Sequence, residues 1–440
     1  MKLSGWGRYP VHNAQVFAPR SEHTLTQRIK VGGMIARGNG RAYGDSAVSH
    51  QNTVHMRHFN RLIGFDQSTG QLVAEAGVLL ADIIRAFLPR GWFPAVTPGT
   101  KFVTLGGMIA ADVHGKNHHK DGSFGGYVDW IDLIDTSGSV KRCSRQENPE
   151  LFEWTVGGMG LTGVILRAAF RLRAVETAWI RQTTLPAANL GAAITLLDQA
   201  SDAAYSVAWI DCLSQGDRLG RSLVMLGEHA TPDDLTEQQR KRPFDIVRRR
   251  EKSVPFSIPS GVFTTVTART FNALYYRRGI RNAGQKLVDW DSYFYPLDAT
   301  LGWNKIYGRK GFAQYQCVLP LDQSRQGLQA LIETISAAGS GSFLAVLKRF
   351  GAQHSRFSFP MLGYTLALDF PVSTRTLTLM NRLDQIVLAH GGRFYLAKDS
   401  RITAQTLRQS DIRAEHFVQM RDDAALRQTF KSAQSERLNL

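Results

Sequence analysis

Residues 98–119 read PGTKFVTLGGMIAADVHGKNHH, and this stretch indicates the fold more clearly than any other part of the chain. Small residues at Gly106, Gly107, Ala110 and Ala111 would let a flat ring system or a phosphate chain approach the backbone closely. The polar run HGKNHH at its end would then place hydrogen-bond donors beside such a ligand. The stretch therefore predicts a binding loop.

Two more glycine-rich loops lie in the same half of the chain. Residues 37–46 read RGNGRAYGDS, and residues 156–166 read VGGMGLTGVIL. Gly38, Gly40 and Gly44 would let successive backbone N–H groups curl into a nest that holds a pyrophosphate. The first loop fits neither standard phosphate template, because it lacks G-x-x-x-x-G-K-[ST] and opens no helix. Each loop alone could be an ordinary turn, but three together favour binding.

Three histidines within six residues, His114, His118 and His119, raise the alternative of a metal site. His114 and His118 would be one helical turn apart. However, Gly115 interrupts a helix there, and no nearby Cys or Glu completes a ligand set. We therefore expect no metal.

Length and composition indicate a globular protein with an acidic partner. A chain of 440 residues favours two domains or one domain with a large insertion. Its 43% hydrophobic and 20% charged residues are typical of folded soluble proteins. The net charge of +16 fits nucleic acid, a phosphorylated ligand or an anionic membrane surface, without choosing among them.

The cysteines and the N-terminus bear on the compartment. Cys143, Cys212 and Cys317 are odd in number and far apart, which disfavours disulfides or structural zinc and favours a reducing compartment. Residues 1–10 lack an apolar run, so we expect no signal peptide. No window reaches the roughly 18 apolar residues of a membrane span. Peripheral membrane contact stays open.

The pattern of elements changes near residue 175. The first part predicts short strands, with a helix at 81–88, a strand at 127–135 and a hairpin at 136–138. The later part predicts strands at 205–213, 222–227, 313–319, 343–350, 364–370 and 393–396, and helices at 189–201, 326–338 and 377–390. Its last six elements follow the order β-α-β-β-α-β, which predicts an antiparallel sheet covered by helices on one face. We expect an α+β fold with domains at 1–175 and 176–392, and a return of 393–440 to the first domain.

Residues 240–259 combine basic and apolar side chains. Seven basic residues between 240 and 252 outnumber Asp245 and Glu251, and Phe244 and Phe256 are interspersed. The segment suits a loop that contacts an anionic membrane surface. A solvated insertion fits the same pattern.

Together these features resemble the PCMH-type FAD-binding domain of the vanillyl-alcohol-oxidase superfamily, whose loops wrap the cofactor's diphosphate. The chain is most similar to the oxidase subunits of the decaprenylphosphoryl-β-D-ribose 2-epimerases. The segments that carry this resemblance are 5–8, 37–45, 98–119, 123–125, 157–165, 205–211, 315–316 and 398–401.

The resemblance implies FAD in an extended pose, with its flavin ring at the domain seam. Many relatives attach the flavin through a His in the first loop. Arg41 occupies that place here, so we expect noncovalent FAD. The implied cofactor-binding residues are Gly38, Asn39, Gly40, Arg41, Ala42, Tyr43, Gly44, Pro98, Gly99, Thr100, Val103, Gly106, Gly107, Ala110, Ala111, Val113, His114, Asn117, His118, Gly160, Gly163, Val164, Ile165, Tyr395 and Lys398.

The resemblance also implies the reacting groups. Lys398, in the family's Lys-Asp-Ser-Arg, is expected to hold the substrate hydroxyl or the flavin carbonyl edge, and can act as a base only if its pKa is lowered. His114 is expected to orient or polarise beside the flavin. The implied substrate-binding residues are Trp6, Tyr43, Phe294, Leu297, Gln314, Gln316, Lys348 and Thr365. Thr365 and Ala367 replace the Asn and Cys of the mycobacterial pattern, so pocket selectivity is expected to differ.

The function implied is oxidation of the C2 hydroxyl of a polyprenyl-phosphoryl-β-D-ribose to the 2-keto sugar. A separate NAD(P)H-dependent reductase would then complete epimerisation to the arabinose form. We expect a cytoplasmic protein with contact to the inner face of the cell membrane through 240–259. An aldonolactone or alditol oxidase is the alternative. A basic nucleic-acid or membrane-binding module without redox chemistry is disfavoured, and we expect no nucleic-acid partner.

Overall fold

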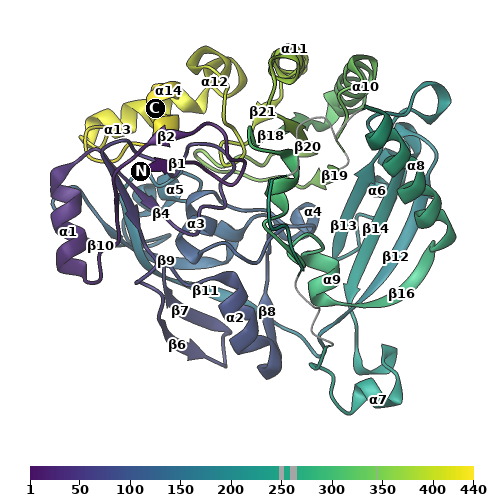
Figure 1. Ribbon diagram of the computed structural model, residues 1–440. Helices are drawn as coiled ribbons and strands as arrows, with labels where there is room; N and C mark the ends of the chain where they lie inside the picture. Colours follow the sequence, from purple (N-terminus) through teal and green to yellow (C-terminus); the bar gives the residue numbers. More distant parts are fainter. Residues whose placement is uncertain (247–251, 258–264, 343) are drawn as a thin grey trace.

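A computed structural model describes residues 1–246, 252–257, 265–342 and 344–440. Figure 1 shows two sheet-based halves that lie side by side. The first half contains a small parallel sheet of order β3-β5-β4 and an antiparallel sheet of order β10-β9-β11-β7-β6, with β8 paired to β11. Its strands are β1 (Lys2–Leu3), β2 (His12–Asn13), β3 (Val16–Phe17), β4 (Met34–Arg37), β5 (Asn52–His55), β6 (Leu62–Asp66), β7 (Gln71–Glu75), β8 (Trp92–Pro94), β9 (Val128–Ile134), β10 (Val140–Ser144) and β11 (Val164–Ala174).

Short helices cover the sheets of this half. They are α1 (Glu22–Val31), α2 (Leu80–Phe87), α3 (Leu105–Ala110), α4 (His118–Asp121) and α5 (Pro149–Thr155). Helix α2 buries Leu80, Ile83, Ile84 and Phe87, an i, i+3, i+4, i+7 stripe that forms part of the core. The predicted helix at 81–88 and strand at 127–135 are confirmed, as is the hairpin at 136–138, where Gly138 has a φ of 87°.

The second half is one antiparallel sheet of order β16-β12-β14-β13-β19-β20-β18-β21. Its strands are β12 (Trp179–Ala187), β13 (Tyr205–Ile210), β14 (Ser222–His229), β16 (Gly284–Asp289), β18 (Phe312–Pro320), β19 (Ala345–Phe350), β20 (Gly363–Pro371) and β21 (Arg393–Phe394). With α10 (Leu321–Ala338) and α11 (Thr374–Ala389), strands β18 to β21 confirm the predicted β-α-β-β-α-β order.

This sheet carries helices on both faces. Helices α6 (Leu190–Gln199), α10 and α11 enclose the core on one face, where Ala208 and Ile210 of β13 are buried. The intervening Trp209 points the other way and contacts Tyr275 of α8 (Thr265–Arg281), with ring centroids 4.7 Å apart. The sequence pattern predicted helices on one face only. Helix α8 was missed because its exposed apolar and basic residues are mixed and form no buried stripe.

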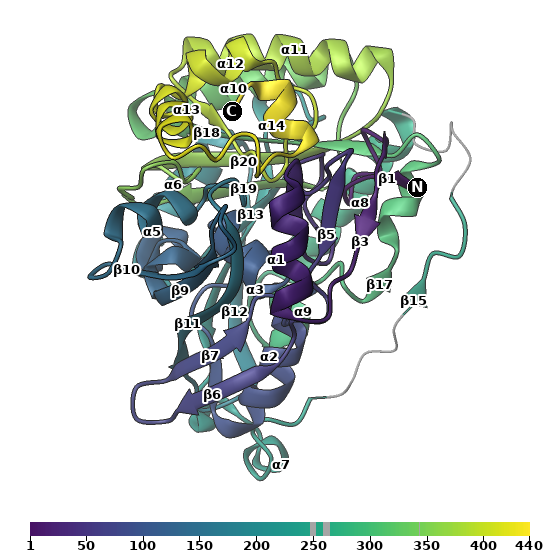
Figure 2. The same ribbon diagram turned by 90° about the vertical axis from the view of Figure 1, so that its left-hand side faces the viewer.

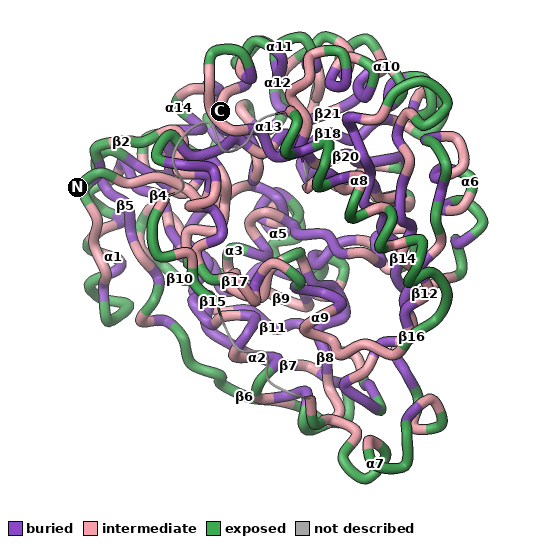
Figure 3. The backbone as a smooth tube through the Cα atoms, turned by 45° about the vertical axis from the view of Figure 1, so that its right-hand side comes forward, coloured by how far each residue is buried: buried purple, intermediate pink, exposed green. Residues whose placement is uncertain are grey.

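The remaining elements are short. They are α7 (Glu237–Arg240), α9 (Trp290–Phe294), β15 (Lys252–Ser253), β17 (Thr300–Leu301), and the 3-10 turns Leu88–Arg90, Phe124–Tyr127, Gly216–Arg218, Pro232–Asp234 and Trp303–Tyr307. Figure 3 shows strands of both sheets largely buried, whereas α7 and much of α8 are exposed.

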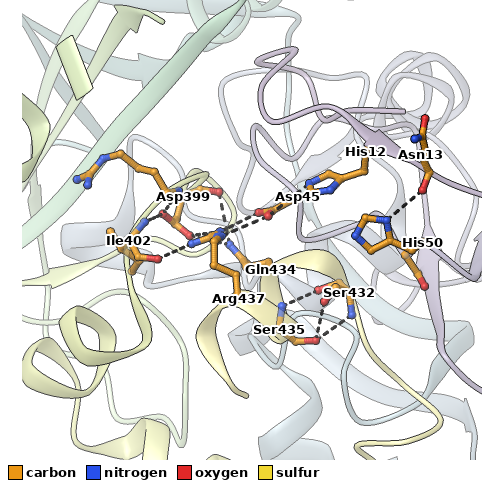
Figure 4. Close-up of polar contacts among 12 residues, drawn as sticks. His12, Asn13, Asp45, His50, Asp399, Ile402, Ser432, Gln434, Ser435 and Arg437 are labelled. Carbon is orange, nitrogen blue, oxygen red and sulfur yellow. Dashed lines mark hydrogen bonds and ion pairs between the residues drawn. The ribbon is translucent and has the colours of Figure 1, made fainter. Parts of the chain in front are cut away.

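In the C-terminal tail, α12 (Ala404–Ser410) contacts α11 and β21 of the second half. Helices α13 (Arg413–Asp423) and α14 (Ala433–Leu438) pack on the first half, as Figure 2 shows beside α1. The Ala433 N–H donates to the Val48 carbonyl at 2.7 Å. Arg437 bridges the carboxylates of Asp45 and Asp399, each at 2.8 Å (Figure 4). Burial alone would raise the pKa of Asp45, but hydrogen bonds from His12 and Arg437 leave it below its ordinary value. The ionised Asp45 therefore holds the tail in place through Arg437.

Candidate functional site

A cavity of about 600 Å³ lies between the two halves and is lined by residues of both. All three predicted glycine loops contribute to its wall. The predicted residues that line it are Trp6, Gly38, Asn39, Gly40, Arg41, Ala42, Tyr43, Pro98, Gly99, Thr100, Val103, Gly106, Gly107, Ala110, Ala111, Val113, His114, Gly160, Gly163, Ile165, Phe294, Leu297, Gln314, Gln316, Lys348, Tyr395 and Lys398.

The first two loops line this cavity and carry backbone N–H groups without a partner in the described part of the chain. Within the described residues, no acceptor pairs with the N–H groups of Asn39, Gly40, Arg41, Gly99 or Thr100. Unpaired amides are rare away from water and bind anions well when several converge. The loops therefore fit the diphosphate of a nucleotide cofactor.

Close packing behind the first loop explains its glycines. A Cβ on Gly38 would lie 2.1 Å from Thr104 Oγ1. Gly40 has a φ of 63°, and a Cβ there would lie 2.4 Å from Arg37 Nη2. No other residue type fits either position without displacing the neighbouring side chain.

A carboxylate from the second half holds the second loop. Asp298 accepts hydrogen bonds from Thr100 Oγ1 and from the Lys101 N–H, both at 2.8 Å. Burial raises the pKa of Asp298, and these two donors oppose that shift. Asp298 also lines the cavity, together with Arg41, whose guanidinium lies 3.9 Å from the Trp6 ring. Asp298 was not predicted from the sequence, although it directly follows the predicted pocket residue Leu297.

His114 has a defined tautomer. Gln316 Nε2 lies 3.1 Å from both His114 Nε2 and Thr365 Oγ1, and the Thr365 hydroxyl donates to the Cys317 carbonyl. Because an amide NH₂ can only donate, His114 Nε2 accepts and its ring proton is on Nδ1. His114 Nδ1 is buried without a partner in the described part of the chain. Burial, and then the charge of Lys348, lowers the pKa of His114 well below its ordinary value, so the ring is neutral.

Lys398 lies where the two halves meet. Its ammonium is 3.8 Å from the centroid of the Tyr43 ring, and the Tyr43 N–H donates to the Ala397 carbonyl at 3.0 Å. Burial lowers the pKa of Lys398 to about 7, with Lys348 adding to the shift and Asp369 opposing it. Both protonation states of Lys398 are therefore accessible near neutral pH.

Asp369 is a buried carboxyl group beside this lysine. It stands opposite Gln314 in the β18–β20 ladder, and Gln314 Nε2 donates to its Oδ1 at 2.6 Å. Burial raises the pKa of Asp369 to about 7 against the opposing effects of Gln314 and Lys398. The sequence analysis missed Asp369, although it alternates with Thr365 and Ala367 on one strand, a period that places all three on the same face.

Two further lysines make this side of the cavity basic. Burial lowers the pKa of Lys348 to about 8 and, with the charge of Lys348, that of Lys116 to about 7. Lys116 donates to the Tyr293 carbonyl and lies 4.0 Å from the centroid of that ring. Among the described residues, Lys348 makes no ion pair. A phosphate would supply the missing counter-charge.

Five predicted residues lie behind the cavity wall. Gly44 packs against the Asp399 carbonyl, Asn117 donates to the Ala95 carbonyl, His118 bonds to Gln353, Val164 lies in a hydrophobic core, and Thr365 holds Gln316. Of these five, Thr365 directly supports a residue of the cavity wall, Gln316.

The cavity also has an aromatic part that the sequence analysis missed. Its members are Trp209 on β13, Phe271 and Tyr275 on α8, and Trp303 after β17. Their common signal is aromatic character, which a core residue shows equally. In the described ranges, no three His, Cys, Asp or Glu side chains gather as metal ligands would. No described helix is both long and apolar enough to span a bilayer.

Comparisons with known proteins agree with this geometry. The FAD binding domain family matches residues 14–144. A decaprenylphosphoryl-β-D-ribose oxidase of Mycolicibacterium smegmatis is 35% identical over 100% of this chain and 97% of the relative. An uncharacterised protein of Streptomyces coelicolor is 31% identical over 82% of this chain and 99% of its own length. An L-gulonolactone oxidase of Bos taurus is 29% identical over 42% of this chain and 43% of its own. The chain is therefore an FAD-dependent oxidoreductase that acts on a CH–OH group.

Proposed function

The chain belongs to the decaprenylphosphoryl-β-D-ribose oxidase family, and we propose that it oxidises the C2 hydroxyl of a polyprenyl-phosphoryl-β-D-ribose to the 2-keto sugar. The observation that carries the proposal is the shared cavity. Amide-rich glycine loops line one side, and Lys398, Asp369, Gln314 and Lys348 line the other. A cofactor held on the first side would face a phosphorylated sugar held on the second.

The residues on the cofactor side bind and orient. The free N–H groups of the two loops would hold the FAD diphosphate, and His114 Nδ1–H would donate to an acceptor of the bound cofactor or sugar. FAD would be bound noncovalently, because Arg41 would lie beside the cofactor and a guanidinium forms no covalent bond to a flavin. Bound FAD supplies the acceptor for the hydride on the carbinol carbon.

The residues on the substrate side handle the proton. Lys398 in its neutral form would accept the C2 hydroxyl proton, and its lowered pKa of about 7 makes that form available. Asp369 and Gln314 would position the sugar beside it. The cationic Lys348 would meet the phosphate that joins sugar and lipid.

The product needs a partner enzyme. A 2-keto sugar becomes the arabinose epimer only after reduction, so we propose a separate NAD(P)H-dependent reductase. We further propose that the protein works in the cytoplasm at the inner face of the cell membrane, where basic residues of 240–259 contribute contact. Phe244 of this segment packs against the hydrophobic core instead. Of that segment, 247–251 and 258–259 lie outside the described residues.

Anaerobic reduction of the bound flavin tests this function. A short-chain prenyl-phospho-ribose should bleach the flavin absorbance within seconds, whereas free alditols and aldonolactones should leave it oxidised. The matching arabinose compound is the stereochemical control, with bleaching expected to be much slower. Rapid bleaching by free alditols, with none by the lipid-linked ribose, would instead establish the alditol oxidase alternative.

A further inference from the structure

Helix α8 (Thr265–Arg281) presents an exposed face next to the cavity. Its inner side is held firmly on the sheet: Asn272 Nδ2 donates to Asp211 Oδ1 at 2.7 Å, and the Tyr276 hydroxyl donates to the Ala187 carbonyl at 3.0 Å. Asn272 is fully buried. These contacts fix the rotation of the helix, so the side chains on its outer arc face away from the protein.

The outer arc of α8 is apolar and basic. Val266 is 71% exposed, Leu274 60% and Ile280 47%. The helix also carries Arg269, Arg277, Arg278 and Arg281, all exposed, and no acidic residue. None of these arginines forms an ion pair within the described residues. Figure 3 shows the exposure of the helix beside the buried strands of the sheet.

This face continues into the cavity. Phe271 and Tyr275 are 46% and 38% exposed, yet both also line the cavity, and their rings lie 5.9 Å apart in a stacked arrangement. An apolar chain could therefore pass from a surface covering α8 to the cavity without crossing open water.

We propose that the outer arc of α8 docks the protein on an anionic lipid bilayer, so that a lipid-linked substrate enters beside Phe271 and Tyr275. This deepens the proposed function and rests on it. Exposed apolar side chains enter the headgroup region, while arginines attract anionic lipid headgroups. A protein partner that buried this arc would have to offset four unpaired arginines with its own carboxylates, whereas anionic lipid supplies that charge without a matched surface.

Vesicle sedimentation of the FAD-loaded full chain tests this proposal. The probes are vesicles of phosphatidylcholine with phosphatidylglycerol, and vesicles of phosphatidylcholine alone. The variants are Leu274→Glu and the pair Arg277→Gln with Arg278→Gln. The matched control is Ile412→Glu, because Ile412 is 76% exposed and lies away from the cavity lining. Thermal melting checks that each variant folds.

We expect wild type and Ile412→Glu to sediment with the anionic vesicles only. Leu274→Glu should weaken that binding at least about tenfold, and the double arginine variant should weaken it similarly. All variants should oxidise a short-chain, water-soluble prenyl-phospho-ribose at the wild-type rate. Failure of that oxidation in wild type would count against the proposed function and not against docking.

Three outcomes would overturn the docking proposal. The first is no sedimentation of wild type with either vesicle. The second is equal binding by Leu274→Glu and wild type. The third is a wild-type dimer in light scattering that Leu274→Glu separates into monomers, since this would show that a second copy covers the arc.

Discussion

The two sides of the cavity present different chemical groups, backbone on one side and side chains on the other. The cofactor side is made by backbone: N–H groups of residues 39–41 and 99–100 that have no partner among the described residues, and glycines whose missing Cβ leaves room. The substrate side is made by side chains from separate strands, with Gln314 on β18, Lys348 on β19, Asp369 on β20 and Lys398 after β21. The first side depends on local chain geometry, and the second depends on strand pairing.

This difference predicts that the two sides fail separately. Substitutions on the backbone side should prevent cofactor binding while the protein still folds. Damage to the side-chain side should leave the cofactor bound and remove the chemistry or the substrate.

Replacement of Lys398 should have the largest effect. Lys398→Met removes the proton acceptor but leaves the amide-rich loops, so FAD should stay bound while kcat falls roughly 10² to 10⁴-fold. Single-turnover flavin reduction and the flavin-to-protein ratio measure the two quantities. Lys310→Met, at an exposed position outside the cavity lining, is the control.

The pH profile sharpens this result. Wild-type kcat should rise with pH through about 7, because the acceptor is neutral only above the pKa of Lys398. That rise should be absent in Lys398→Met. If kcat of Lys398→Met still rises with pH, the rise would be assigned to the titration of Asp369, whose pKa is also about 7.

Substitution in the second loop should separate folding from cofactor binding. No atom lies within 4 Å of a Cβ placed on Gly99, so Gly99→Val should fold normally. The new side chain would occupy space beside the free N–H groups, and FAD affinity should fall about 100-fold, or roughly 3 kcal/mol. Gly64→Val is the control, since Gly64 is equally open and lies on β6. Titration of the stripped protein with FAD measures the affinity, and undiminished binding would contradict a diphosphate site in this loop.

Replacement of Lys348 should stabilise the fold while it harms substrate binding. Burial depresses the pKa of Lys348 to about 8, so the unfolded chain binds this proton more tightly than the folded chain does. The resulting destabilisation of the folded state is fully present below about pH 8. Lys348→Met should therefore raise the free energy of unfolding by about 3 kcal/mol at pH 7, and this gain should disappear as the pH rises from about 8 toward 10.5. Urea unfolding measures this gain. The KM of Lys348→Met for a prenyl-phospho-ribose should also rise. An unchanged KM would show that Lys348 does not contact the substrate.

Most residues that the sequence predicted for the backbone side line the cavity. The two loops, 37–46 and 98–119, are contiguous, so their glycines could be recognised within ten or twenty residues. The sequence predicted the substrate side less well. Asp369 was missed, because a buried carboxyl and a surface one look alike before the strands are paired. Asp298, which holds the second loop of the backbone side, was missed for the same reason.

What the sequence determined by itself was local: where the chain can turn, where its amides can remain unpaired, and which helices and strands alternate. What only the tertiary structure decided was proximity between distant segments. Strand pairing joins Gln314 to Asp369, burial depresses the pKa of Lys398, and packing of α8 against the sheet turns its arginines outward. Charge–charge energies and desolvation depend on the distances between groups and on their burial in the folded protein. Neither the distances nor the burial can be read from the sequence directly.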